Sequence, residues 1–129
     1  MIAVDTNVVV RYIARDDPVQ SPKAKAFVDD NEVFVLTTVA LEAGWVLASR
    51  HRFSRDDVTR ALSGFMGLPT VTPENPVATR KALGWIENGL GFADALHLAQ
   101  AEAKDAFVTF DRDLAKTGDR LASVPVRLL

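Results

Sequence analysis

The sequence contains no cysteine and only two histidines among its 129 residues. The missing cysteines exclude disulfides and thiolate zinc sites, and two histidines are too few for a histidine-rich metal centre. No apolar run approaches the ~18 residues of a membrane-spanning helix, and the N-terminus lacks the basic stretch of a secretory signal. Neither sign of charge dominates, because fifteen Lys and Arg stand against seventeen Asp and Glu, for a net charge of -2. These absences predict a soluble, cytoplasmic protein without disulfides or membrane spans.

Apolar residues make up 48% of the chain, which is typical of a globular protein rather than a disordered one. A chain of this length buries about two-thirds of the surface of its unfolded form, so it can hold a core of its own. The sequence shows no repeat, low-complexity tract or linker. We therefore expect one domain that spans residues 1–129.

Short apolar segments alternate with helical patterns along the whole chain. The helices are expected at Thr6–Ala14, from Ser21-Pro22 onward, from Thr37 or Thr38 to Ser49, from Ser54, from Asn75-Pro76, and at Ala93–Lys104. The strands are expected at Met1–Val4, Val33–Leu36, Thr70–Thr72, Ala106–Thr109 and Val124–Arg127. Such alternation predicts an α/β fold with a mostly parallel sheet of about five strands that is covered by helices on both faces.

Two of the expected strands run directly into an aspartate, at Asp5 and at Asp111. Ligands of parallel α/β folds sit at the carboxyl ends of the strands, so both carboxylates are candidates for a functional site. Aspartate is also a favoured N-cap, and for either residue alone capping of the next helix is an equally good interpretation.

Glu42 lies within an expected helix, and its neighbours one turn away include Val39, Trp45 and Val46. An unpaired carboxylate on such an apolar face is costly, and the spacing from Thr37 or Thr38 does not fit a capping box. A functional role or a buried salt bridge would explain this residue.

Asp94 stands at the beginning of another expected helix, where N-capping is an alternative to a functional role. Four acids from separate elements, Asp5, Glu42, Asp94 and Asp111, could thus converge at one edge of the sheet. Clustered carboxylates repel one another unless a cation lies between them, and a set of oxygen ligands suits Mg²⁺ or Mn²⁺. Such a site fits the metal-assisted attack of water on a phosphodiester.

Four short motifs resemble those of PIN domains in order and spacing. They are Val4-Asp5-Thr6-Asn7, Glu42 followed by Trp45-Val46-Leu47, Asp94-Ala-Leu-His-Leu-Ala99, and Thr109-Phe-Asp111. Each motif is weak alone, but the ordered set covers nearly the whole chain. The chain is most similar to the VapC-type toxins of toxin–antitoxin pairs.

The resemblance implies a three-layer α/β/α sandwich and a ribonuclease that depends on Mg²⁺ or Mn²⁺. Asp5 and Asp94 would bind the metal directly, and Glu42 and Asp111 would act through water. The resemblance also implies a homodimer and a small antitoxin protein that occupies the acidic site. The residues expected to hydrogen-bond the carboxylates or the phosphate are Thr6, Asn7 and Thr109; Asp113 would assist through water or be a solvated surface acid.

A net charge of -2 does not by itself favour RNA binding. The four candidate acids contribute -4, however, so the rest of the chain carries a net charge of +2. Arg11 and Arg15 lie one turn apart on the first helix, and Arg112 follows the fourth acid. We expect these three arginines to contact RNA phosphates, although each could equally be a solvated surface charge.

Other acid-based functions fit less well. A haloacid-dehalogenase-type phosphatase needs a second aspartate where this chain has Asn7, and a receiver-like signalling module needs an aspartate where it has Thr72-Pro73. The alternative that stays open is a PIN fold that binds RNA or a partner without cleaving RNA.

Overall fold

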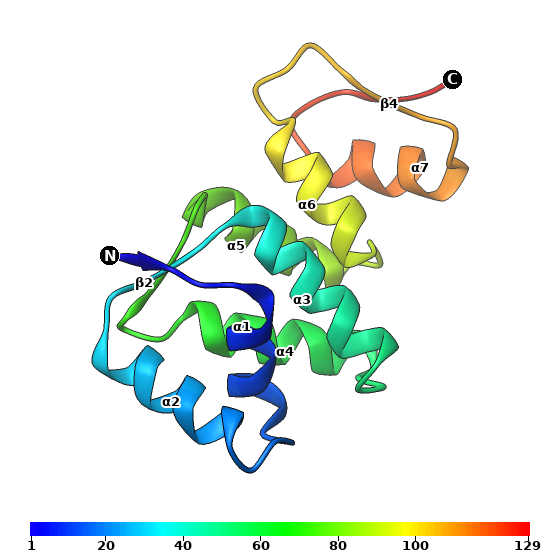
Figure 1. Cartoon of the computed structure of the whole chain (residues 1–129). Coiled ribbons are helices and arrows are strands. Elements are labelled where there is room, and N and C mark those ends of the chain that lie inside the picture. Colours follow the sequence, from blue (N-terminus) through cyan, green and yellow to red (C-terminus); the bar gives the residue numbers. More distant parts are fainter. The chain divides into compact units, whose positions relative to one another are not determined.

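Residues Met1–Pro76 form a unit built on three short parallel strands in a computed structural model that describes all 129 residues. The strands lie side by side in the order β1-β2-β3, with Ile2 opposite Val33 and Val33 opposite Val71 (Figure 1). Each crossover between neighbouring strands contains two helices. The elements are β1 (Ile2–Ala3), α1 (Thr6–Ala14), α2 (Gln20–Asp30), β2 (Val33–Val35), α3 (Thr37–Ser49), α4 (Arg55–Met66) and β3 (Val71–Pro73).

Residues Val77–Leu129 form a second unit, in which two strands also pair in parallel. Its elements are α5 (Pro76–Ile86), α6 (Phe92–Gln100), β4 (Phe107–Thr109), α7 (Arg112–Leu121) and β5 (Val126–Leu128). The helix α7 connects the two strands and packs against both. The predicted α/β class with five parallel-paired strands is confirmed, and the strands form one sheet of three and one of two.

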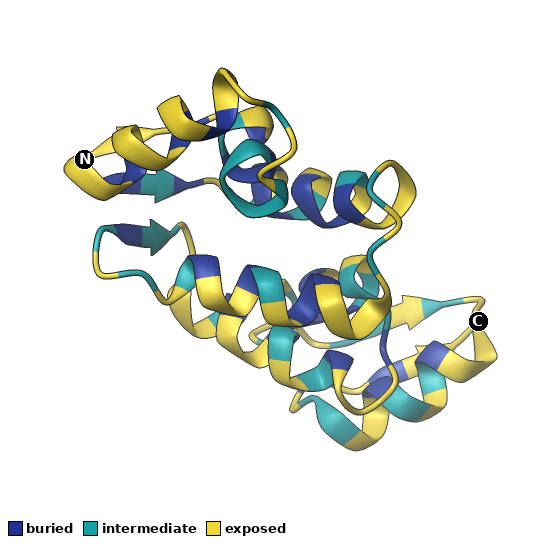
Figure 2. Ribbon diagram, turned by 90° about the horizontal axis from the view of Figure 1, so that it is seen from below, coloured by how far each residue is buried: buried dark blue, intermediate teal, exposed yellow.

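Aliphatic side chains supply the core of each unit. In the first unit α1 packs against α2 and α3, and the fully buried residues include Val9, Val28, Leu47 and Leu62. In the second unit Leu96, Leu98 and Val124 are fully buried. A side-chain Cβ at Gly118 would lie 3.1 Å from Leu98 Cδ2, so glycine lets α7 approach α6 closely. Buried and exposed residues alternate along the helices, as expected for amphipathic segments (Figure 2).

The sequence pattern predicts Ser21 as the cap of one helix and Thr37 or Thr38 as the cap of another, and both predicted caps are wrong, although α3 starts at Thr37 as expected. Ser21 does not cap α2, because Asp17 Oδ1 accepts hydrogen bonds from the backbone N–H groups of Val19 and Gln20 at 2.9 and 2.6 Å. The helix α3 begins at Thr37 after Leu36, and neither Thr37 nor Thr38 serves as its cap.

Other boundaries and burial predictions also differ in part. The residues Ser54 to Asp57 have the sequence pattern of a capping box, and the structure confirms it, since Ser54 and Asp57 each accept the other's backbone N–H. The helix α6 ends at Gln100 rather than Lys104. The apolar segments Met1–Val4 and Val33–Leu36 have the composition of buried strands, but only β2 is buried as this predicts, because Ile2 of β1 is about half exposed. No helix combines the length and the apolar character needed to cross a membrane.

Candidate active site

Asp5 stands between β1 and α1 with an exposed side chain. Its backbone is extended, at φ -82° and ψ 165°, and it occupies the N-cap position of α1. The carboxylate nevertheless accepts no capping hydrogen bond from the helix. The capping interpretation of Asp5 is therefore wrong, and its carboxylate oxygens are free for another ligand.

Thr6, the next residue, connects this strand end to α3. The Thr6 side chain is buried, and its Oγ1 donates a hydrogen bond to Oε1 of Glu42. The two residues are 36 positions apart in the sequence, so the contact depends on the packing of α1 against α3. This hydrogen bond anchors the Glu42 carboxylate beside the residue that follows Asp5.

Glu42 is exposed, which corrects the expectation that it lies on an apolar face in contact with the core. The helix α3 buries Val39, Ala40, Ala43, Gly44 and Leu47. Glu42 and Trp45 occupy the opposite side of the helix, and Trp45 is 62% exposed. No buried salt bridge holds Glu42, because its hydrogen-bond partner is the neutral Thr6 hydroxyl.

Glu74 positions the start of α3, a role that sequence reasoning missed. Its Oε1 accepts a hydrogen bond from the backbone N–H of Thr37 at 2.9 Å. Its own backbone N–H donates to the Val35 carbonyl at 2.8 Å, which fixes Glu74 beside the end of β2. The available signal was a carboxylate directly after β3, at the same sheet edge where α3 begins.

In the second unit, Asp111 caps α7. Its Oδ1 accepts a hydrogen bond from the Leu114 N–H at 3.0 Å, so the capping interpretation is correct for this aspartate. Thr109 Oγ1 accepts the Asp111 N–H at 3.0 Å. Arg112 and Asp113 are exposed in the first turn of α7. One oxygen of the Asp111 carboxylate is thus committed to the helix.

Asp94 lies in the first turn of α6 and is half-buried. The N-cap of this helix is Gly91, so Asp94 is not the cap that the sequence allowed. Asp94 Oδ2 lies 3.9 Å from the position that a Cβ of Gly91 would occupy. A side-chain Cβ at position 91 would therefore make only an ordinary van der Waals contact with this carboxylate.

Comparison with known families identifies the protein family of this chain. The family model described as PIN domain matches residues 2–120, which includes all four acids. The chain belongs to the PIN-domain family. No curated protein matches the sequence. PIN domains are generally nucleases that use divalent metals and act on RNA.

The acids of this PIN domain suit a hard divalent cation chemically. Asp5 and Glu42 offer carboxylate oxygens, and Mg²⁺ is commonly held by one or two carboxylates together with waters and substrate phosphates. Neither unit by itself brings three or more acidic or histidine side chains together as a metal cage. The first unit thus contains two of the four acids, Asp5 and Glu42, rather than a complete set of ligands.

The arginines expected to contact RNA differ in how they are engaged. Arg11 pairs with Asp16, with Nη1 and Oδ1 3.1 Å apart, and its Nε donates to Gln20 Oε1 at 2.8 Å. Arg15 and, in the second unit, Arg112 are both exposed, and neither forms an ion pair. Arg11 is therefore the least available of the three.

Proposed function

We propose that this PIN domain is a divalent-metal-dependent endoribonuclease. The observation that carries the proposal lies at the end of β1. There the Asp5 carboxylate forms no capping hydrogen bond, and the next residue, Thr6, hydrogen-bonds the Glu42 carboxylate. Neither carboxylate has a cationic partner in the first unit, and Asp5 lies at the carboxyl end of a parallel strand, where α/β folds bind their ligands. A divalent cation with an RNA phosphate would be that ligand.

Each residue has a role in this proposal. Asp5 and Asp94 bind the metal directly, while Glu42 and Asp111 act through water. Thr6 and Thr109 orient carboxylates, and Asn7 hydrogen-bonds the phosphate. When bound, Mg²⁺ or Mn²⁺ supplies charge neutralisation on the phosphodiester and Lewis-acid activation of water. The expected products carry 5′-phosphate and 3′-hydroxyl ends.

We also propose that the chain is the toxin of a toxin–antitoxin pair and forms a homodimer. The support is its resemblance to VapC-type toxins. An acidic site favours a basic group as inhibitor, because a guanidinium or ammonium group can replace the cation between the carboxylates. The inhibitor would thus be a small antitoxin that places a basic side chain on Asp5 and its neighbours.

Cleavage of a mixed RNA pool tests the nuclease proposal. We expect the wild-type protein to cut RNA with Mg²⁺ or Mn²⁺ and not with EDTA. Asp5→Asn should reduce cleavage by at least about a hundredfold, because it removes several kcal/mol of metal-dependent stabilisation. Asp30→Asn, which changes an exposed acid at the end of α2, is the matched control and should cut normally.

The same assay addresses the alternative function. RNA binding without cleavage, at any metal concentration, would replace the nuclease by a PIN-fold binding module. Cleavage that persists in Asp5→Asn and in EDTA would identify a contaminating ribonuclease.

A further inference from the structure

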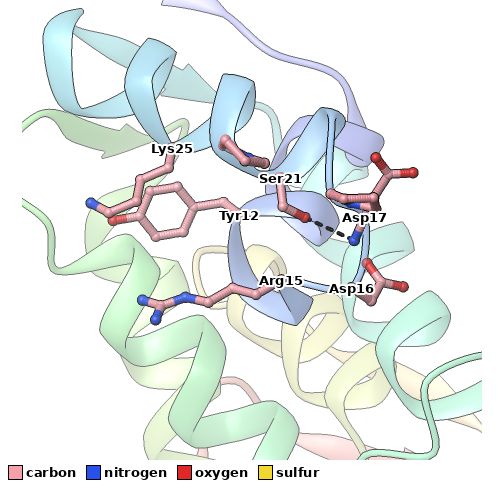
Figure 3. Close-up of a pocket in the computed structure, with 8 residues that line it drawn as sticks. Tyr12, Arg15, Asp16, Asp17, Ser21 and Lys25 are labelled. Atoms are coloured by element: carbon pink, nitrogen blue, oxygen red, sulfur yellow. Dashed lines mark hydrogen bonds between the residues drawn. The ribbon is translucent and has the colours of Figure 1, made fainter.

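A pocket of about 480 Å³ lies in the first unit, between the end of α1 and the start of α2. Its volume falls within the range of small-ligand sites, which is about 300–1,000 Å³. Figure 3 shows the residues that line the pocket, with its polar side chains labelled. The residues that line it are Tyr12, Arg15, Asp16, Asp17, Pro18, Ser21, Pro22 and Lys25.

The two acids of the pocket already have partners. Asp16 pairs with Arg11 at 3.1 Å and lies 3.4 Å from His51 Nδ1. Asp17 accepts the backbone N–H groups of Gln20 and Val19, and these hydrogen bonds lower the pKa of the Asp17 carboxyl. Neither carboxylate is paired with Arg15 or Lys25, the two cations that line the pocket.

The cations flank an aromatic ring. Arg15 ends α1 in the left-handed conformation, at φ 53°, with an exposed guanidinium that forms no ion pair. The Lys25 Nζ lies 5.8 Å from the centre of the Tyr12 ring. The Lys25, Tyr12 and Arg15 side chains extend side by side in one direction (Figure 3). Their polar ends thus face the same opening.

The two cations differ in how they are engaged. Lys25 pairs with Asp29, with Nζ and Oδ2 2.5 Å apart, and this hydrogen bond raises the pKa of Lys25. The Tyr12 hydroxyl also donates to Asp29, at 3.4 Å. Arg15 is therefore the cation left for an anion at this opening, and its planar guanidinium matches two phosphate oxygens.

We propose that this pocket binds one nucleotide of single-stranded RNA, with its phosphate between Arg15 and Lys25 and its base against Tyr12 and Pro18. The inference rests on the proposed action on RNA. Bases stack on aromatic side chains and guanidinium planes without regard to sequence, which suits a contact away from the scissile bond. An acidic peptide would use the cations but would leave the ring and proline surface without a planar partner.

The helix α1 relates the pocket to Asp5. This helix has nine residues and is about 13 Å long, with Asp5 at its start and Arg15 at its end. A strand of RNA that is cut near Asp5 could therefore continue along α1 into the pocket. The pocket would hold the substrate without taking part in the chemistry.

Fluorescence anisotropy with a labelled single-stranded RNA, in EDTA so that nothing is cut, tests the inference with the full chain. The double variant Arg15→Gln/Lys25→Gln removes both cations of the pocket. Lys23→Gln, on the exposed face of α2, is the control for the loss of a cation outside the pocket. We expect the double variant to lose about tenfold in affinity. Its slope of log affinity against log salt should also fall by about 0.7, the value for one phosphate of a single strand. Lys23→Gln should change neither, and unfolding temperatures should stay equal.

Equal RNA affinity for the double variant and the control would overturn the pocket proposal. It would also fail if a peptide of glutamate and tyrosine bound the wild type and lost affinity in the double variant while RNA did not. Cleavage by the wild type with Mg²⁺ is measured in the same preparations. Cleavage with unchanged affinity refutes the pocket alone, and no cleavage with reduced affinity in the double variant refutes the nuclease alone.

Discussion

At the scale of single residues, aspartates in similar sequence positions do different work. One carboxylate oxygen of Asp111 accepts a hydrogen bond from the first turn of α7. Asp5 also lies at a strand end, but its carboxylate forms no such hydrogen bond with α1. The neighbour of Asp5, the buried Thr6, uses its hydroxyl to hold Glu42 rather than to cap the helix. Hydrogen bonding, not residue type, therefore separates the structural acid from the one left available for a ligand.

Thr6→Val tests the value of that hydroxyl. Valine keeps the shape of threonine but cannot donate to Glu42, so the carboxylate loses its fixed position. We expect RNA cleavage to fall between tenfold and a hundredfold, and the Mg²⁺ concentration for half-maximal cleavage to rise, as when groups that orient metal ligands are removed. A metal titration of the cleavage rate measures both effects.

Thr6→Ser is the matched control, because serine keeps the hydroxyl, and it should restore most of the cleavage and the metal dependence. If Thr6→Val lowered only the unfolding temperature and left the metal dependence unchanged, Thr6 would have a purely structural role.

At the scale of secondary-structure elements, α3 presents Glu42 to solvent because its small residues Ala40, Ala43 and Gly44 are buried. Its first turn is fixed by Glu74, a residue 37 positions after Thr37. The spacing of apolar residues predicted this helix, but its cap comes from a distant segment. Local patterns such as the Ser54 capping box are predictable, whereas caps formed across the sheet edge are not.

Glu74→Ala should destabilise the protein by about 1 kcal/mol, the typical cost of removing a helix cap. Chemical denaturation measures this change as a shift of the midpoint at constant slope. Glu74→Gln keeps an oxygen acceptor for the Thr37 N–H and should retain most of the stability. Equal midpoints for Glu74→Ala and the wild type would show that this hydrogen bond contributes nothing to stability.

At the scale of the whole molecule, the PIN family match spans residues of both units, and each unit contains two of the four acids. A metal that binds only the folded chain stabilises it by mass action. Metal binding can therefore be measured without any RNA, as a change in the stability of the whole protein.

At ten times its dissociation constant, Mg²⁺ or Mn²⁺ should stabilise the wild type by about 1.4 kcal/mol. For a chain of this size, that corresponds to a rise in unfolding temperature of about 5 °C. Asp5→Asn should lose the rise, and Asp30→Asn should retain it. Thermal melts with added metal and with EDTA measure the difference, and an equal rise in Asp5→Asn would remove Asp5 from the metal site.

The sequence by itself determined the α/β class, the order of helices and parallel strands, and the family, because apolar periodicity and short motifs are local properties of the chain. It also marked Asp5 and Glu42 as residues in need of an explanation. Only the tertiary structure decided that the Thr6 hydroxyl, next to Asp5, hydrogen-bonds Glu42 and that Glu74 caps α3. These contacts join residues more than thirty positions apart, and their geometry exists only once the helices have packed on the sheet.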